Sequence, residues 1–250
     1  MVLGLPSSLT FLISDWLTVN TVTKRSFSYF LYIGLGLHPH LQKLFRLNIA
    51  LAPVTILKNV QHALRPAANA LYGVFNTLRD LGYNEFLPHG GQSFVVTMLC
   101  KVVPHICEKG ISMLAGPDHN NMNKTRLPVY MAHYPVGTSS KNMLHYAQLV
   151  KSGLFRMYDY GAKNVEHYGD YEPPSYDVKK VKVPTIIVQG MEDWMATPKD
   201  VDFTASQLPH LVKRIVIRTY NHADFIWGMH AHKDIYLPLV EIMKEHLNEV

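Results

Sequence analysis

Cysteine is scarce in this sequence, where Cys100 and Cys107 are the only two among 250 residues. Such a pair indicates little about the redox compartment, because it is compatible with a disulfide, with two free thiols or with chance. Long apolar runs are missing as well. The longest, from Phe27 to Leu37, has about half of the ~18 residues that a helix needs to cross a bilayer, so we expect no transmembrane segment.

Basic residues are absent from the first positions, Met1-Val-Leu-Gly-Leu-Pro6, so we expect no signal peptide in this chain. A dense basic patch is missing too. The net charge is +5, but the 24 lysines and arginines are scattered, and the densest run is Lys179-Lys180-Val-Lys182. Since no recognised nucleic-acid-binding module accompanies these charges, nucleic acid is not an expected partner. We also expect no cofactor and no metal ion.

The sequence does contain enough apolar material for a folded core, with 48% hydrophobic and 17% charged residues. A chain of this length can bury one core, or a core plus a cap. Strand-like runs alternate with helical stretches at both ends, which predicts a parallel α/β sheet. From about Thr55 to Asp170 the periodicity is helical, and this indicates a mainly helical cap inserted into the sheet.

The spacing of apolar residues gives the expected elements. Strands are expected at Ser26–Gly34, Leu47–Val54, Val183–Gly190 and Arg214–Tyr220, the first and last of them buried, and helices at residues 5–19 and 233–249. Pro238 should start or kink the last helix. The resulting division is a partial core at residues 1–54, a cap or lid at 55–172 and the rest of the core at 173–250.

Two ionisable residues follow neighbouring predicted strands. Asp193 lies three residues after the strand that ends at Gly190, and His222 lies two residues after the strand that ends at Tyr220. Ligands of parallel sheets bind beyond the carboxyl ends of the strands. An acid after one strand and a histidine after the next is the order in which an α/β-hydrolase carries two members of a Ser-Asp-His triad.

Other readings of the same residues stay open. The chain has 14 histidines, so any one of them is more often structural than catalytic. Asp193 would also serve as the cap of the helix that follows its turn. Asp200 is a second acid nearby, and Asp224 is an alternative local partner for His222.

Four segments have motifs in common with one family. Tyr220–Trp227 reads Tyr-Asn-His-Ala-Asp-Phe-Ile-Trp, Gln189–Pro198 is an acid turn, His133–Ser139 reads His-Tyr-Pro-Val-Gly-Thr-Ser, and Ala50–Val54 reads Ala-Leu-Ala-Pro-Val. Together they resemble the acid lipase family, which includes gastric and lysosomal lipases. The resemblance implies an α/β-hydrolase with a lid, in which Asp193 and His222 are the acid and the base. It also implies a neutral lipid or ester substrate, a lipid interface, and a lysosomal or secreted location.

The resemblance implies two covalent features of the cap. Family members have a disulfide near the positions of Cys100 and Cys107, although the spacing is shorter here. A continuous helix would hold the two Cα atoms too far apart for a disulfide, and Pro104 between them favours a break. Asn123-Lys-Thr125 lies where family members carry a sequon, so Asn123 is a glycosylation candidate in a chain that enters the secretory pathway.

The chain departs from the family pattern at the nucleophile motif, because Gly-x-Ser-x-Gly does not occur in it. On the resemblance, Tyr32-Ile-Gly34 corresponds to the start of this elbow motif and His38-Pro39 to the turn after its helix. The serine and the helix would then be missing between them. Such a loss would expose apolar faces of the sheet, so we expect low stability. A skipped exon, a fragment or a serine-less pseudoenzyme would each explain the gap.

Two function hypotheses follow. The first is a lipase-family ester hydrolase that retains Asp193 and His222 but is inactive in this form. The alternative is a non-catalytic protein that binds lipid or a partner through apolar cap residues, such as Met98, Leu99, Met113 and Leu114, together with Trp227. The sequence fixes neither the ester, nor the oligomeric state, nor the compartment.

Overall fold

The computed structural model describes residues 19–24, 26–60, 64–86, 91–134 and 137–248. The helix expected at residues 5–19 lies outside this range, apart from the residue that begins the first strand. In chain order the helices and strands are β1 (Val19–Lys24), α2 (Ser26–Leu37), β2 (Phe45–Leu51), α3 (Leu64–Asp80), β3 (Glu85–Phe86), α4 (Gly91–Val102), α5 (Pro104–Ala115), α6 (Leu127–His133), β4 (Thr138–Ser139), α7 (Ser140–Ser152), α8 (Asn164–Tyr168), β5 (Thr185–Gly190), α9 (Pro198–Gln207), β6 (Leu211–Ile217), α10 (Asp224–Trp227) and α11 (Leu237–Asn248).

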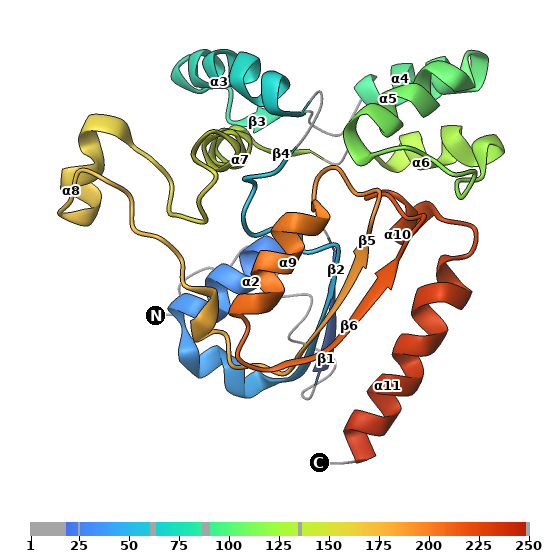
Figure 1. Cartoon of the computed structure of the whole chain (residues 1–250). Helices are drawn as coiled ribbons and strands as arrows, with labels where there is room; N and C mark the ends of the chain where they lie inside the picture. The colour runs from blue at the N-terminus through green and yellow to red at the C-terminus, as the bar shows by residue number, and fades with distance from the viewer. Residues whose placement is uncertain (1–18, 25, 61–63, 87–90, 135–136, 249–250) are drawn as a thin grey trace.

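Four parallel strands form the main sheet, in the order β1-β2-β5-β6. β5 is buried at all its positions because it has a strand on each side and helices over both faces (Figure 1). Its β-branched residues Ile186, Ile187 and Val188 suit a strand covered on both faces. They belong to the same core cluster as Leu47 of β2 and Val201 of α9.

Helices cover both faces of this sheet, with α2 and α9 on one face and α11 on the other (Figure 1). Thr197 caps the start of α9, because its side chain accepts from the backbone N–H of Asp200, and Pro198 is the first helical residue. α11 begins at Leu237 with Pro238 in its first turn, as expected, after a π-helical turn over His232–Tyr236. The helices α3 to α7 gather beyond the carboxyl ends of the strands. The division of the chain into core and cap stays a prediction.

The strand expected at Ser26–Gly34 is wrong, because these residues form helix α2. An uninterrupted apolar run without two-residue alternation does not distinguish a buried strand from a buried helix. Tyr32 and Leu35, three residues apart, both face the core and are 2% and 1% exposed. Since α2 connects β1 to β2, the packed helix that we expected to be missing is present. Low stability stays a prediction, without the loss of this helix as its reason.

Strand β6 begins three residues earlier than the expected Arg214–Tyr220 and is not buried. Among the described strands it pairs only with β5. Half-buried Ile215 and Ile217 alternate with exposed Arg214 and Val216, the pattern of a strand with one covered face. The strands predicted at Leu47–Val54 and Val183–Gly190 are confirmed as β2 and β5, each within a few residues.

Cys100 of α4 and Cys107 of α5 form a disulfide, with their Cα atoms 5.5 Å apart. The helix is interrupted at Val103, which has non-helical dihedrals, and Pro104 begins α5. This break folds the two helices back on each other and brings the sulfur atoms within bonding reach.

Replacing both cysteines by serine (Cys100→Ser with Cys107→Ser) is expected to lower the free energy of unfolding by about 2–3 kcal/mol, because the disulfide closes a short loop in the unfolded chain. Thiol titration of the denatured wild-type chain should detect its cysteines only after reduction. Equal thiol counts with and without reductant would contradict the disulfide.

Candidate functional site

His222 and Asp193 meet just beyond the carboxyl ends of β6 and β5. His222 Nδ1 donates to Asp193 Oδ2 over 2.8 Å, and the two side chains are only 1% and 0% exposed. Asp193 Oδ1 accepts from the backbone nitrogens of Met195 and Ala196, over 2.8 and 2.7 Å. The turn after β5 therefore fixes one carboxylate oxygen and presents the other to the imidazole.

The second ring nitrogen of His222 is available to accept a hydrogen bond. Nε2 is buried and has no hydrogen-bond partner among the described residues. Because Nδ1 donates to Asp193, Nε2 of the neutral ring is the unprotonated nitrogen and accepts a proton. A buried polar atom without a partner is uncommon and calls for a functional explanation. An orienting carboxylate with an imidazole of this kind is the arrangement of a general base.

The other two acids considered from the sequence are held elsewhere. Asp200 accepts from Asn59, through the backbone N over 2.9 Å and the side-chain Nδ2 over 2.6 Å. Asp224 accepts from the backbone of Asn221. Thr197, and not Asp193, caps helix α9. Of the three acids, Asp193 is the one hydrogen-bonded to His222, while its catalytic role stays a prediction.

Backbone contacts hold the acid turn against the loop after β6 that carries His222, which we call the histidine loop. Met191 N donates to Ile217 O over 3.0 Å, and Glu192 N donates to Tyr220 O over 3.1 Å. A Cβ atom at Gly190 would lie only 2.1 Å from Tyr220 O. Glycine is therefore required for this approach, and the two segments form one packed unit.

The segment at residues 115–122, which lies within the predicted cap and is called the cap segment below, lies against the same unit, and the sequence indicated no role for it. Ala115 O accepts from the backbone nitrogens of both Trp194 and His222, over 3.3 and 3.1 Å. Gly116 has φ +112°, and a Cβ atom there would lie 1.9 Å from Glu192 O. The available signal was Gly116-Pro117 directly after a helix, a dipeptide typical of turns.

The apolar residues considered for lipid binding divide into two groups. Trp227 is 8% exposed and stacks on Tyr130 of α6, with ring centroids 5.1 Å apart. The cap residues are exposed instead of forming core, at 43% for Met98, 46% for Leu99, 56% for Met113 and 49% for Leu114. Helices α4 and α5 therefore carry unburied apolar side chains.

A cavity of about 350 Å³ lies beside α3 and α7, and it includes neither Asp193 nor His222. Its lining residues are Arg65, Asn69, Tyr72, Ala147 and Lys151. The site is therefore assigned from hydrogen-bond geometry and not from cavity shape. Within the described ranges, no group of three or more His, Cys, Asp or Glu residues is arranged to hold a metal ion.

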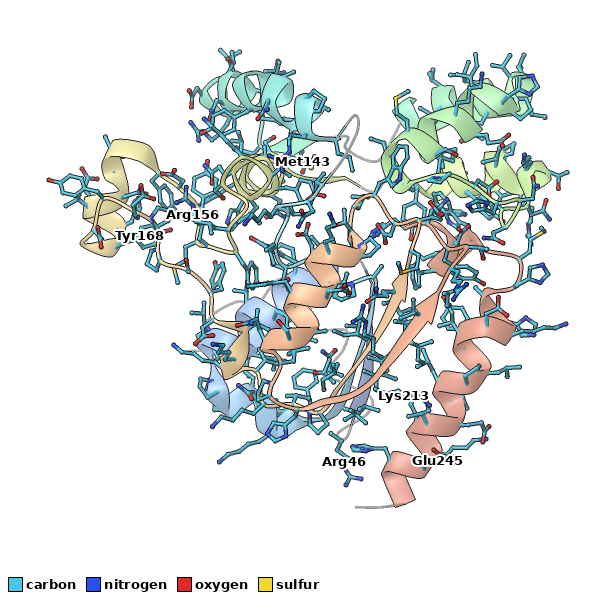
Figure 2. All side chains as sticks on the ribbon, viewed as in Figure 1. Arg46, Met143, Arg156, Tyr168, Lys213 and Glu245 are labelled. Atoms are coloured by element: carbon cyan, nitrogen blue, oxygen red, sulfur yellow. A yellow bond between two sulfur atoms is a disulfide. The ribbon has the colours of Figure 1, made fainter. Side chains whose placement is uncertain are left out.

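The end of the sheet away from the Asp193–His222 pair carries charged side chains. Figure 2 shows Arg46, Lys213 and Glu245 at the end of the sheet opposite the cap. Asn123 Oδ1 accepts from Thr125 N over 3.1 Å, beside exposed Lys124, and its glycosylation stays a prediction. Within the part of the chain that the structure describes, no helix is long and apolar enough to span a membrane.

Comparison with curated proteins finds lipases. Lipase lipl-1 of Caenorhabditis elegans is 40% identical over 206 residues, which are 78% of this chain and 50% of that protein. Human gastric triacylglycerol lipase is 34% identical over 86% of this chain and 54% of its own length. The lysosomal acid lipase/cholesteryl ester hydrolase of Macaca fascicularis is 34% identical over 86% of this chain and 55% of its own. The chain thus spans about half the length of the curated relatives it matches.

Among solved structures, the monoacylglycerol lipase of Paleococcus ferrophilus is similar with a TM-score of 0.53. It is 11% identical, and the match covers 96% of this chain and 72% of that one. A likeness at this level of identity concerns the fold alone. No family model matches the sequence.

Proposed function

Because the chain belongs to an acid-lipase-like family, we propose that it is the acid- and base-bearing part of a lipase-type carboxylic ester hydrolase. Its fold is that of the α/β-hydrolases, with part of the parallel sheet in the described residues. The single observation that supports the proposal most is the buried 2.8 Å hydrogen bond between His222 and Asp193, with Nε2 unpaired. Relatives named as triacylglycerol lipase and cholesteryl ester hydrolase support a neutral lipid ester as the substrate class.

In this proposal His222 is the base and then the acid. Its Nε2 takes the proton of a nucleophilic hydroxyl and later gives it to the leaving alcohol. Asp193 holds the imidazole in the tautomer with Nδ1 protonated and stabilises the imidazolium that forms. Backbone N–H groups beside the nucleophile would stabilise the tetrahedral intermediate, at about 3 kcal/mol for each donor.

We propose the junction of β1 and α2 as the position of the nucleophile. The four strands are parallel, so the end of β1 lies on the same edge of the sheet as the turns that carry Asp193 and His222. In this fold the nucleophile occupies a turn from strand to helix, and β1 ends one residue before Arg25 while α2 begins one residue after it. Arg25 itself lies outside the described residues.

Tyr32–Gly34, expected from the resemblance to be the start of the elbow motif, lies within α2 and not at a turn from strand to helix. The sequence at the junction, Thr23-Lys-Arg-Ser-Phe27, has Arg25 at the central position of an elbow motif, with Ser26 one residue later, and it lacks the flanking glycines. We therefore propose that this chain retains the acid and the base but lacks the activated serine.

A fluorophosphonate probe, which reacts with activated serines, tests the missing nucleophile. We expect the purified chain to be labelled no more than its heat-denatured control, because the junction offers no serine at position 25. Labelling of the native chain would overturn the inactivity. If that labelling disappeared in His222→Ala, it would at the same time support His222 as the base.

We also propose a lysosomal or secreted location and contact with a lipid surface. The gastric and lysosomal names of the relatives support the location, and a disulfide such as Cys100–Cys107 persists in oxidising compartments. The exposed apolar side chains of α4 and α5 support the lipid contact. The alternative of a non-catalytic binding protein gains no support from the comparisons.

A further inference from the structure

Asp224 is a buried carboxylate two residues after His222, and the proposed reaction does not use it. It begins α10 and is 0% exposed. Its Oδ2 accepts from Asn221 N over 2.8 Å and from Asn121 Nδ2 over 3.3 Å. Its Oδ1 is buried and has no hydrogen-bond partner among the described residues. An ionised carboxylate in this position is poorly compensated.

The two asparagines that bind Asp224 also connect the histidine loop to the cap. Asn221 Nδ2 donates to the carbonyl oxygens of Gly116 and Pro117, over 3.1 and 3.0 Å. Asn121 Nδ2 donates to Thr219 O over 2.8 Å, and Asn121 O accepts from Met229 N over 2.7 Å. Asp224 therefore lies where the cap segment 115–122 and the loop that carries His222 are joined.

The charged and titratable groups around Asp224 come from three segments. Asp118 and His119 face it from the cap segment, and Tyr220 faces it from the end of the histidine loop. His119 Nε2 lies 3.7 Å from Glu192 Oε1 of the acid turn. Asp118 opposes a negative charge on Asp224, whereas His119 favours it, so the neighbouring charges act in both directions.

We infer that Asp224 is a positioning residue which, in its neutral form, holds the loop that carries His222 against cap residues 115–122. The inference rests on the proposed function for the role of His222, but the junction itself is defined by contacts alone. With its charge removed, Asp224 keeps an acceptor for Asn221 N and no longer repels Asp118. With its charge present, the same junction contains a buried and incompletely paired anion.

The direction of the pH dependence follows from burial. The pKa of Asp224 is raised from 3.8 to about 6, and burial is the largest cause. The N–H groups of Asn221 and Asn121 and the charge of His119 act to lower this pKa, whereas Asp118 acts to raise it. The folded chain holds this proton up to about pH 6, whereas the unfolded chain releases it near pH 4. The stability contributed by the neutral group is thus present at acidic pH and is lost as the pH rises from about 4 to about 6.

Thermal unfolding of the full chain at about pH 5 and about pH 7.5 tests the inference, with Asp224→Asn as the variant that imitates the neutral form. We expect the fall in Tm between these pH values to be about 4 °C smaller in Asp224→Asn than in the wild type. The exposed Asp170→Asn removes the same charge elsewhere on the surface and is the matched control. An unchanged fall in Asp224→Asn would overturn the inference.

Two NMR measurements separate positioning from general stability. The amide proton of Asn221, which donates to Asp224 Oδ2, should shift with a midpoint near pH 6 in the wild type and lose that transition in Asp224→Asn. The amide of His222, which donates to Ala115 O, should exchange faster in Asp224→Ala and remain protected in Asp224→Asn. Equal exchange in all three proteins would contradict the positioning role. None of these measurements uses a substrate, so a failure of the proposed function would be seen separately, by probe labelling.

Discussion

We expect a chain with Thr23→Gly, Arg25→Ser and Phe27→Gly to react covalently with a fluorophosphonate probe, at a rate about 100-fold or more above that of the wild-type chain. The substitutions create Gly-x-Ser-x-Gly at the turn between β1 and α2. The acid and the base are already assembled, since Asp193 and His222 are 2.8 Å apart and buried. On the proposed function, the hydroxyl is the part of the triad that this chain lacks.

Three variants make this result specific. Arg25→Ala in the same double-glycine background keeps the elbow but has no hydroxyl, and it should not react. His222→Ala added to the serine variant should remove most of the labelling, because the base is lost. Asp200→Asn, which alters a buried acid that is bound to Asn59, should leave the reaction in place. A folded serine variant that remains unlabelled would contradict the position that we assign to the nucleophile.

Gly116→Ala is expected to lower the free energy of unfolding by about 3–5 kcal/mol. Gly116 has φ +112° and ψ 170°, a backbone region that only glycine adopts without strain. The added Cβ would also lie 1.9 Å from the backbone oxygen of Glu192, which is less able to move than the end of a side chain. The contact between α5 and the acid turn would open, and with it the contact between the cap and His222.

Gly110→Ala provides a matched control in the same helix. Gly110 is exposed within α5, and a Cβ atom there meets no atom of the described residues within 4 Å. This substitution should stabilise the chain by about 0.5–1 kcal/mol, because alanine loses less backbone entropy in a helix than glycine does. Denaturant unfolding measures both variants. Similar free energies of unfolding for Gly116→Ala and the wild type would show that cap and acid turn are not in close contact.

Where local composition determines the structure, the sequence was sufficient to predict it. The β-branched run at Val183–Gly190 predicts a strand, and β5 forms there at Thr185–Gly190. Asp193 and His222 follow strands that are neighbours in a parallel sheet, so their approach could be expected from topology. Spacing along the chain could not decide which of Asp193, Asp200 and Asp224 is the partner of His222, because all three lie within a few residues of the required place.

Where long-range packing determines the structure, the sequence was not sufficient to predict it. The aromatic run at Ser26–Leu37 has no periodicity that separates helix from strand, and it is a helix that buries Tyr32 and Leu35. The strand Leu211–Ile217 contains the Val and Ile residues of a buried strand, but β5 is its only partner in the described sheet. Its burial depends on neighbours that a local pattern does not contain.

The sequence by itself determined the class of fold, the strands β2 and β5, and the candidate residues Asp193 and His222 after the last two strands, because these depend on residues close together in the chain. Only the tertiary structure showed that Asp193 is the acid hydrogen-bonded to His222 and that residues 115–122 contact the same unit, and it supports the β1–α2 junction as the proposed position of the nucleophile. These contacts link residues far apart in sequence, such as Ala115 and His222. Their geometry is fixed by packing and close backbone approach, as at Gly116 and Gly190, which no spacing along the chain encodes.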